Sequence, residues 1–352
     1  MKVLSLFDGM ACGMIAMQLA GVQVESYDAY EIDKYAIKTA QHNFPMIKEH
    51  GDVFAADFTQ YEGVDFLIGG SPCTYWSSAQ TKNRETVASG MGWELFSQYV
   101  RALHEAKPKY FIYENVKSMS KDIRASIDET FGFEAVLINS ALVSAQNRQR
   151  FYWVGRRNED GTYSKVNVEQ PADRGILLKD VLDSAVARDM AAEPINDIYQ
   201  VGAMPRPDGE ISTSAGFCIY STEAKGRYLC ANGGGSGAKT GLYAIPYSIE
   251  FDDDGRPNKA IGKDGKEITI YEVRDGKITI KGKQYPIKLK DGFYIIRKLT
   301  VSECKRLQTV PEWYEFPVSN SQAYKMLGNG WTCEVIAHLI RSCNGRTNGV
   351  ME

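Results

Sequence analysis

The sequence lacks the features that mark membrane, secreted and disulfide-stabilised proteins. No apolar run approaches the ~20 residues that a helix needs to cross a bilayer. The N-terminal MKVLSLFDG has neither the long apolar stretch nor the small-residue cleavage site of a signal peptide. The seven cysteines are odd in number and never spaced as CxxC, which argues against a disulfide framework and a zinc site. We therefore expect a cytoplasmic protein with reduced thiols and no metal.

The chain also lacks a strong net charge. Its formal charge is −3 over 352 residues, which neither favours nor excludes a nucleic-acid partner. The distribution is more informative, because the segment 256–298 holds twelve Lys or Arg residues against five Asp or Glu. Such a basic segment favours a polyanionic partner, and a solvated hairpin surface is the alternative.

The first 155 residues alternate between short apolar strands and amphipathic helices. This pattern predicts a doubly wound, mostly parallel α/β sheet. The predicted strands are 2–7, 24–31, 64–70 and 109–116, and the predicted helices are 13–22, 33–44 and 94–106. Two further strands, 133–142 and 148–155, are expected to form a hairpin at one edge.

The pattern changes at about residue 160, where Gly, Asp and Pro increase and β-rich pieces follow. Asp-Gly pairs at 275–276 and 291–292 stand between alternating apolar runs, which predicts hairpins. Helix returns with Thr300 as N-cap and Glu303 completing a capping box. We expect an α/β domain of residues 1–160 and 296–352, interrupted by a β-rich domain of residues 161–295.

A glycine-rich turn follows the first predicted strand. In LFDGMACGM, residues 6–14, Gly9 and Gly13 would allow a ligand to approach the backbone. Ligands of open α/β sheets bind at the carboxyl ends of the strands, where this turn lies. The spacing is not GxGxxG, which weakens a dinucleotide site without excluding it.

Two acidic residues suggest which ligand binds there. Glu31 ends the second strand, where a carboxylate can accept both hydroxyls of a ribose, and Ile32 could lie against an adenine ring. Asp52, with Val53 beside it, could accept from an adenine amino group. An acid after a strand is more often a solvated loop residue, but the order of these features favours an adenosine-bearing cofactor.

The stretch GGSPCTYWSS, residues 69–78, presents a single cysteine after a rigid turn. Cys73 follows the third strand and Glu114 ends the next, so both would lie at the cofactor edge of the sheet. A thiol beside a carboxyl group favours covalent catalysis with proton delivery, although a lone cysteine is usually a buried apolar residue. Arg148 and Arg150 would share one strand face and could hold Glu114 and contact the substrate.

The stretch NGGGSGAKTG, residues 232–241, imitates a phosphate-binding loop. Ala238 separates Gly237 from Lys239, so the contiguous Gly-Lys-Ser/Thr of a P-loop is missing. We therefore exclude nucleoside triphosphate binding there, and retain the loop as a contact for a nucleic-acid backbone.

These motifs, in this order, resemble those of the DNA cytosine-5 methyltransferases of bacterial or phage type. The resemblance covers the whole α/β part of the chain. It is carried by FDGMACG, GGSPC, ENV, QNRQR, RKLTVSECKRLQTVP and MLGNGWTCEVIAHL. Two positions depart from the family's usual pattern: Ile32 replaces an aromatic residue, and the bulky Trp331 follows Gly330.

The resemblance implies a class I methyltransferase fold in which the β-rich insert is the target recognition domain. It implies methyl transfer from S-adenosylmethionine to C5 of a flipped-out cytosine in a specific duplex DNA sequence. Cys73 would attack C6 and Glu114 would assist at N3, with Arg148 and Arg150 in the catalytic set. The implied cofactor residues are Phe7, Asp8, Gly9, Ala11, Gly13, Glu31, Ile32, Asp52, Val53, Ser71, Pro72, Leu95, Asn329, Gly330 and Trp331.

The implied partner is double-stranded DNA, in a bacterial or phage-infected cell and associated with the nucleoid. We expect DNA contacts from Ser77, Gln80, Lys239 and Thr240. We also expect a monomer without membrane contact, and the resemblance leaves open a cognate restriction endonuclease.

Three other functions are weighed against this one. An RNA cytosine methyltransferase would share most of these residues, but the Cys-Phe-Thr signature of the tRNA-modifying branch is absent and the long insert favours DNA. A catalytically silent DNA-binding homologue would be expected to lose Cys73 or Glu114. An NAD-linked oxidoreductase would explain Glu31 but leave Cys73, Glu114 and the arginines without a role.

Overall fold

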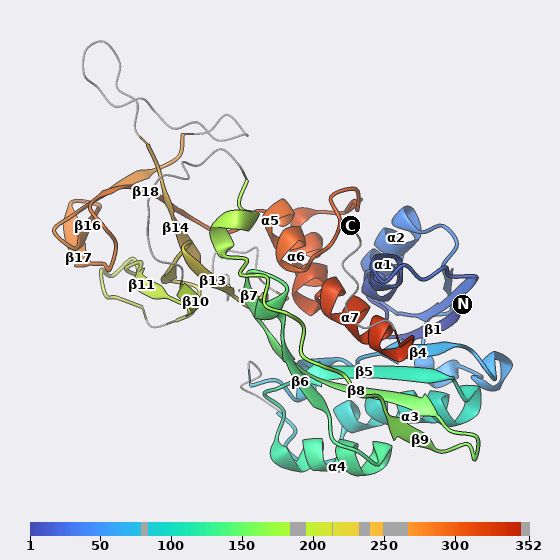
Figure 1. Ribbon diagram of the computed structural model, residues 1–352. Coiled ribbons are helices and arrows are strands. Elements are labelled where there is room, and N and C mark those ends of the chain that lie inside the picture. Colours follow the sequence, from blue (N-terminus) through green and yellow to red (C-terminus); the bar gives the residue numbers. More distant parts are fainter. Residues whose placement is uncertain (79–83, 184–194, 213, 232–239, 249–266, 346–352) are drawn as a thin grey trace.

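The larger part of the chain is built on one eight-stranded sheet (Figure 1). The computed structural model describes residues 1–78, 84–183, 195–212, 214–231, 240–248 and 267–345. The strand order is β3-β2-β1-β4-β5-β8-β6, and β9 pairs with β8. The strands are β1 (Lys2–Leu6), β2 (Ser26–Tyr30), β3 (Lys48–Glu49), β4 (Phe66–Gly69), β5 (Tyr110–Val116), β6 (Val136–Asn139), β8 (Gln149–Arg157) and β9 (Tyr163–Lys165).

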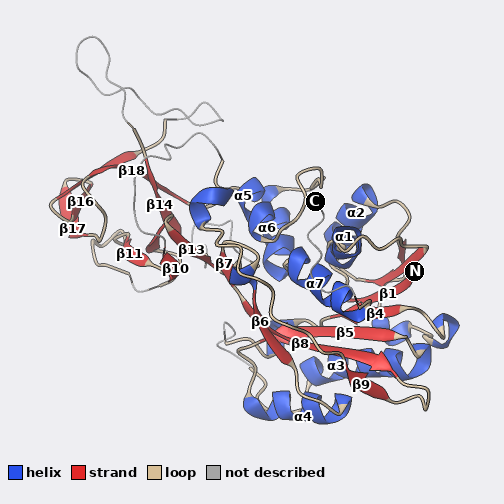
Figure 2. Ribbon diagram, in the orientation of Figure 1, coloured by secondary structure: helices blue, strands red, loops and turns tan. Residues whose placement is uncertain are grey.

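Helices cover both faces of this sheet (Figure 2). Successive side chains of a strand point to opposite faces of the sheet, and in β1 both faces are apolar. Val3 packs in the core under α1, α2 and α7, whereas Leu4 and Leu6 pack under α3 and α4. Strands β1 to β5 pair in parallel, as the alternation of strands and helices predicts. The helices are α1 (Cys12–Leu19), α2 (Lys34–Asn43), α3 (Met91–Ala106), α4 (Lys121–Phe131) and α7 (Cys333–Cys343).

The expected edge hairpin is confirmed. Strand β8 runs antiparallel to β6, with Val136 opposite Tyr152, and also antiparallel to β5 on its other side. The sequence did not reveal α4, nor α6 (Asn320–Asn329). In α4 the Ser120 side chain accepts from Ile123 N at 3.2 Å, a cap whose signal the sequence does contain.

The chain from β10 to β18 forms a second lobe, which contains a seven-stranded sheet in the order β11-β12-β14-β18-β15-β16-β17, at the left of Figure 1. Between the two sheets lies a three-stranded sheet, β10-β13-β7, in which β7 directly precedes β8. The strands are β7 (Gln146–Asn147), β10 (Ile195–Ile198), β11 (Gln200–Ala203), β12 (Cys218–Ser221), β13 (Ala224–Arg227), β14 (Leu242–Pro246), β15 (Ile270–Arg274), β16 (Lys277–Ile280), β17 (Lys283–Pro286) and β18 (Gly292–Arg297).

One of the two Asp-Gly hairpins is confirmed and the other prediction is wrong. Asp275 and Gly276 have φ values of 50° and 68° and join the antiparallel strands β15 and β16, as a tight hairpin turn requires. Asp291 instead precedes β18 and Gly292 begins it, and β18 pairs with β14 and β15 and not with β17. An Asp-Gly dipeptide indicates that the chain turns there. Which strands then pair depends on contacts with strands that are distant in the sequence.

An ion pair between the partly exposed Arg297 and the buried Glu303 joins β18 to α5 (Val301–Leu307), where the chain returns to the larger lobe. The carboxylate of Glu303, which is 0% exposed, accepts from both terminal nitrogens of Arg297 at 2.7 and 2.8 Å. It also accepts from Thr300 N at 2.7 Å, and Thr300 Oγ1 accepts from Glu303 N, which confirms the expected capping box. In the described part of the chain, no helix is long and apolar enough to span a membrane.

We predict that Glu303→Ala lowers the free energy of unfolding by about 2–4 kcal/mol, because it removes a fully buried carboxylate that accepts from the partly buried Arg297 and caps α5. Glu312→Ala is the matched control. Glu312 pairs with Arg306 at 2.7 Å but is exposed, so its loss should cost about 0–1 kcal/mol. Denaturant titration of both variants provides the measurement, and equal losses would contradict the prediction.

Candidate active site

One cavity of about 240 Å³ lies at the carboxyl ends of β1, β4 and β5. Its position is the one that open α/β sheets use for ligands. Thirteen of the predicted site residues line it: Phe7, Asp8, Gly9, Glu31, Ser71, Pro72, Cys73, Glu114, Arg148, Arg150, Asn329, Gly330 and Trp331. Sequence reasoning missed ten others: Met10, Cys12, Asp33, Ala36, Gly70, Thr74, Val116, Lys325, Met326 and Gly328.

The turn after β1 presents a carboxylate to the cavity. Asp8 Oδ1 accepts from Ser5 Oγ at 2.5 Å and from Tyr27 OH at 2.6 Å, whereas Oδ2 is buried and has no hydrogen-bond partner within the described ranges. Burial raises the pKa of Asp8 to about 6, against the lowering effect of these hydrogen bonds. The turn therefore offers an unpaired acceptor to a ligand with a hydrogen-bond donor.

Backbone N–H groups orient the carboxylate of Glu31. Oε1 accepts from Ile32 N and Asp33 N, each at 2.8 Å, and Oε2 accepts from Gly9 N at 2.9 Å. Since a carboxylate offers about four acceptor positions, roughly one is left for a ligand. Contact of Glu31 with the hydroxyls of a ribose stays a prediction.

Six predicted cofactor residues do not line the cavity: Ala11, Gly13, Ile32, Asp52, Val53 and Leu95. Gly13 serves packing, because a Cβ there would lie 2.3 Å from the Ile68 side chain and 2.6 Å from Tyr27 OH. Ile32 is 75% exposed, and Asp52 is exposed with Oδ1 accepting from Phe54 N at 3.0 Å. Cofactor contacts by these six residues stay predictions.

Cys73 begins a short 3-10 turn directly after Pro72 and is half-buried. Burial raises the pKa of its thiol above the ordinary 9.0. The nearby guanidinium of Arg150 acts in the opposite direction, and the carboxylate of Glu114 raises the pKa further. Forming the thiolate therefore depends on the charges around it.

Behind this turn, the predicted Ser71 and several side chains that sequence reasoning missed fix the backbone. Ser71 Oγ and Tyr113 OH lie 2.6 Å apart, and Asn115 Nδ2 donates to Ser71 O at 3.2 Å. Trp76, fully buried, donates from Nε1 to Glu85 at 3.0 Å. The β5 sequence YFIYENV does not alternate polar with apolar residues, so no local pattern pointed to Tyr113 and Asn115.

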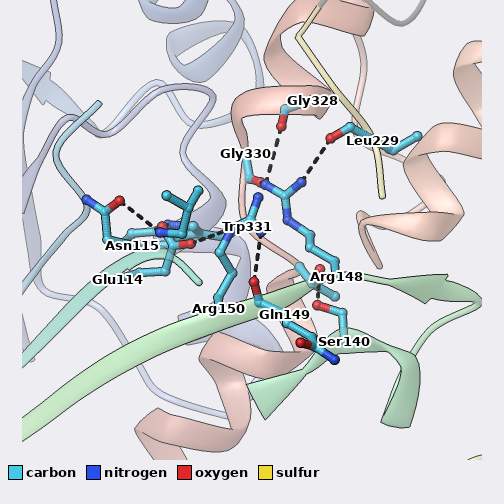
Figure 3. A network of polar contacts seen from close by, with 12 residues as sticks. Glu114, Asn115, Ser140, Arg148, Gln149, Arg150, Leu229, Gly328, Gly330 and Trp331 are labelled. Carbon is cyan, nitrogen blue, oxygen red and sulfur yellow. Dashed lines mark hydrogen bonds and ion pairs between the residues drawn. The ribbon is translucent and has the colours of Figure 1, made fainter. Parts of the chain in front are cut away.

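Two donors hold the carboxylate of Glu114 (Figure 3). Arg150 Nε lies 3.0 Å from Oε1, and Trp331 Nε1 donates to Oε2 at 3.0 Å. Glu114 lies on β5 opposite Tyr152 of β8, so the antiparallel pairing brings Arg150 to the same edge of the sheet. The carboxylate is 9% exposed and faces the same cavity as Cys73.

Arg148 does not bond to Glu114 but holds three carbonyl oxygens from distant segments (Figure 3). These belong to Leu229 at 3.1 Å, Gly328 at 3.3 Å and Gly330 at 2.8 Å. Arg148 is 3% exposed, and burial lowers its pKa to about 10. Its contacts therefore tie the strand that carries Arg150 to the second lobe and to the loop at 328–331.

The backbone of the second lobe touches that loop directly. A Cβ on Gly328 would lie 2.2 Å from the carbonyl carbon of Cys230 and 2.4 Å from Ala231 N. Only a residue without a side chain allows this approach, so Gly328 marks where the two lobes meet.

The predicted DNA contacts divide between described and undescribed residues. Ser77 lies just after the Cys73 turn and donates from its backbone N to Cys73 O at 2.8 Å. Thr240 is buried, and its Oγ1 has no hydrogen-bond partner among the residues that the structure describes. Gln80 and Lys239 lie outside the described residues. Within the described ranges, no group of three or more His, Cys, Asp or Glu side chains is arranged to hold a metal ion.

Comparison with solved structures shows the fold. The chain aligns with a Dnmt2 methyltransferase of S. pombe at a TM-score of 0.60 and 15% identity, covering 98% of both chains. It aligns with the methyltransferase EhMeth of Entamoeba histolytica at a TM-score of 0.62 and 14% identity, again covering 98% of both. The α/β lobe therefore has the class I methyltransferase fold, as expected.

Comparison with protein sequences shows the family. The orphan methyltransferase M.SPRI of Bacillus phage SPR is 26% identical over 97% of this chain and 97% of its own length. The type II methyltransferase M1.ScrFI of Lactococcus lactis subsp. cremoris is 29% identical over 93% of this chain and 74% of its own length. The family model for C-5 cytosine-specific DNA methylase matches residues 1–345. The chain therefore belongs to this family and is a DNA cytosine-5 methyltransferase.

Proposed function

We propose that the enzyme methylates C5 of a flipped-out cytosine in a specific duplex DNA sequence, with S-adenosylmethionine as donor and Cys73 as nucleophile. The observation that carries the proposal is the shared cavity. The Cys73 thiol, the Glu114 carboxylate and the turn at Gly9 all line it, although they come from three different strands' ends. A nucleophile, a proton-transfer group and a nucleotide-type site within one small space support methyl transfer to a bound base.

The residues of the cavity fit S-adenosylmethionine. Asp8 Oδ2 is an unsatisfied acceptor for a donor group on the ligand, and Glu31 keeps one acceptor position for a ribose hydroxyl. Ile32 offers an exposed apolar side chain beside Glu31, which suits an adenine face. When bound, this cofactor supplies an electrophilic methyl group.

The chain's own residues would act in sequence on the cytosine. The Cys73 thiolate adds to C6, and the electron pair of the C5–C6 double bond becomes available at C5. Glu114 donates a proton or hydrogen bond to N3, so that negative charge does not accumulate on the ring. C5 then takes the methyl group, with S-adenosylhomocysteine as the leaving group. Loss of the C5 proton to solvent and cleavage of the bond between C6 and sulfur restore the double bond and release Cys73 as thiolate, while N3 returns its proton to Glu114.

Arg150 would support both catalytic groups. Its guanidinium lies 3.0 Å from Glu114 and also favours the thiolate form of Cys73. The target base must leave the helix to reach them, because C6 is inaccessible within the base stack. Extrusion costs a few kcal/mol, which contacts along the DNA must offset.

We assign recognition of the DNA sequence to the second lobe. Its β15–β17 sheet edge carries exposed lysines, among them Lys277, Lys281 and Lys283. Positive charge of this kind supports phosphate contacts, which position a protein on DNA without reading its sequence. Specificity would then come from other side chains of the lobe that reach the base edges.

We predict that DNA carrying 5-fluorocytosine at the target position forms a stable covalent adduct with the enzyme, because fluorine cannot leave C5 as a proton does. Cys73→Ala should abolish the adduct. Cys230→Ala, which removes the other half-buried thiol, should keep it. Denaturing electrophoresis detects the adduct, and its persistence in Cys73→Ala would reject Cys73 as the nucleophile.

We predict that alkylation of Cys73 by iodoacetamide accelerates as the pH rises toward and beyond 9.0, since burial raises the pKa of the thiol. Glu114→Gln removes a negative charge that raises this pKa, so Cys73 should react faster at any fixed pH below it. Mass spectrometry follows both thiols together, with Cys230 as the internal control. An unchanged or slower Cys73 rate in Glu114→Gln would contradict the electrostatic account.

We predict that Glu31→Ala weakens S-adenosylmethionine binding by about 1–3 kcal/mol, the cost of an unmade buried hydrogen bond. Asp52→Ala should weaken binding in the same direction. Glu25→Ala, exposed at the opposite end of the same strand, is the control and should bind normally. Calorimetry provides the affinities, and wild-type values for both Glu31→Ala and Asp52→Ala would refute this cofactor site.

A further inference from the structure

The indole of Trp331 contacts the carboxylate that the proposed mechanism uses. Trp331 Nε1 donates to Glu114 Oε2 at 3.0 Å, and both side chains line the cavity (Figure 3). The two residues are 217 positions apart in the chain. The sequence predicts Trp331 only as a cofactor contact, and this hydrogen bond to Glu114 is an additional interaction.

Gly70 leaves the space that this hydrogen bond needs. A Cβ at position 70 would lie 3.0 Å from Glu114 Oε2 and 3.5 Å from Trp331 Nε1. It would also lie 2.8 Å from the Glu114 carbonyl oxygen. The second glycine of GGSPC thus lies against the donor and the acceptor together, and a side chain there would press on both.

The loop that carries the indole is fixed from behind. Gly330 O accepts from Arg148 at 2.8 Å and from Gln308 Nε2 at 3.1 Å. Next to it, Thr332 Oγ1 donates to Gln308 Oε1 at 2.9 Å and lies 2.8 Å from Ser140 Oγ. A donor on an anchored loop loses little freedom when it holds a carboxylate, so its hydrogen bond is preorganised.

Arg150 and Trp331 each donate to a different oxygen of the Glu114 carboxylate. Arg150 holds Oε1 and Trp331 holds Oε2, which fixes the plane of the Glu114 carboxyl group. Each oxygen has about two acceptor positions, so each keeps one for the base. Without the indole N–H, Oε2 would lose its only protein donor among the described residues, and rotation of the group would be restrained at one oxygen alone.

We propose that Trp331 is a positioning residue for Glu114, separate from any contact that it makes with the cofactor. The inference rests on the proposed role of Glu114 at N3 of the cytosine. Trp331 itself touches no reacting atom and acts through the orientation of the carboxylate.

Trp331→Phe removes the N–H and keeps an aromatic ring. Single-turnover methylation at saturating cofactor and DNA should slow by about ten-fold or more, the value of a hydrogen bond to a charged group. The dissociation constant for S-adenosylmethionine should change less than about two-fold, because the ring remains. Trp313→Phe, at a half-exposed tryptophan packed on Phe44, is the matched control and should methylate at the wild-type rate.

The same substitution in a Glu114→Gln background decides through which residue Trp331 acts. If Trp331 positions Glu114, Trp331→Phe should add little further loss there, since coupled residues are non-additive. An equal loss in both backgrounds, or a wild-type rate for the single variant, would overturn the proposal. A wild-type rate for Glu114→Gln alone would instead overturn the proposed role of Glu114.

A second variant tests the same hydrogen bond in case Trp331→Phe does not fold. Replacing Trp331 with 3-benzothienylalanine keeps the size and shape of the indole and exchanges N–H for sulfur. It should reproduce the slower methylation with unchanged cofactor affinity. A wild-type rate for this variant would overturn the proposal even if Trp331→Phe is unstable.

Discussion

The buried guanidinium of Arg148 is the interaction on which the site depends. Its partners are carbonyl oxygens at positions 229, 328 and 330, so one cation joins the catalytic sheet, the second lobe and the loop that carries Trp331. A planar fork with several donors suits this task better than the single ammonium of a lysine. Because these oxygens come from distant parts of the chain, the site can only be complete when both lobes are folded.

The carboxylate of Glu114 is held by the same arrangement. Arg150 follows Arg148 by two residues, and Trp331 follows the carbonyl of Gly330 that Arg148 holds, so both donors to Glu114 are placed by one anchor. The thiol of Cys73 is treated differently, since burial opposes its ionisation and a nearby cation favours it. Hydrogen bonds thus fix the orientation of the Glu114 carboxylate, whereas the nearby charges determine how readily the Cys73 thiol ionises.

Sequence reasoning succeeded where neighbouring residues determine the outcome. The Thr300–Glu303 capping box and the Asp275–Gly276 turn are local, and both were predicted correctly. The parallel pairing of β1, β2, β4 and β5 followed from the alternation of strands and helices, and the family followed from ordered motifs. It failed where distant segments decide, as at Asp291–Gly292 and in the hydrogen bond between Trp331 and Glu114, for which no local pattern exists.

The contact of Gly328 with the backbone at 230–231 bears on how such enzymes exchange specificities in evolution. The boundary of a transferable recognition module is set by contacts and not by where β-rich sequence begins. Strand β13 pairs with β7 of the catalytic half, and Leu229 and Cys230 lie against its core. Recombination that keeps residues 224–231 with the α/β lobe would preserve these contacts between the lobes. Crossovers at about residues 160 and 295 would instead replace the residues on one side of each contact.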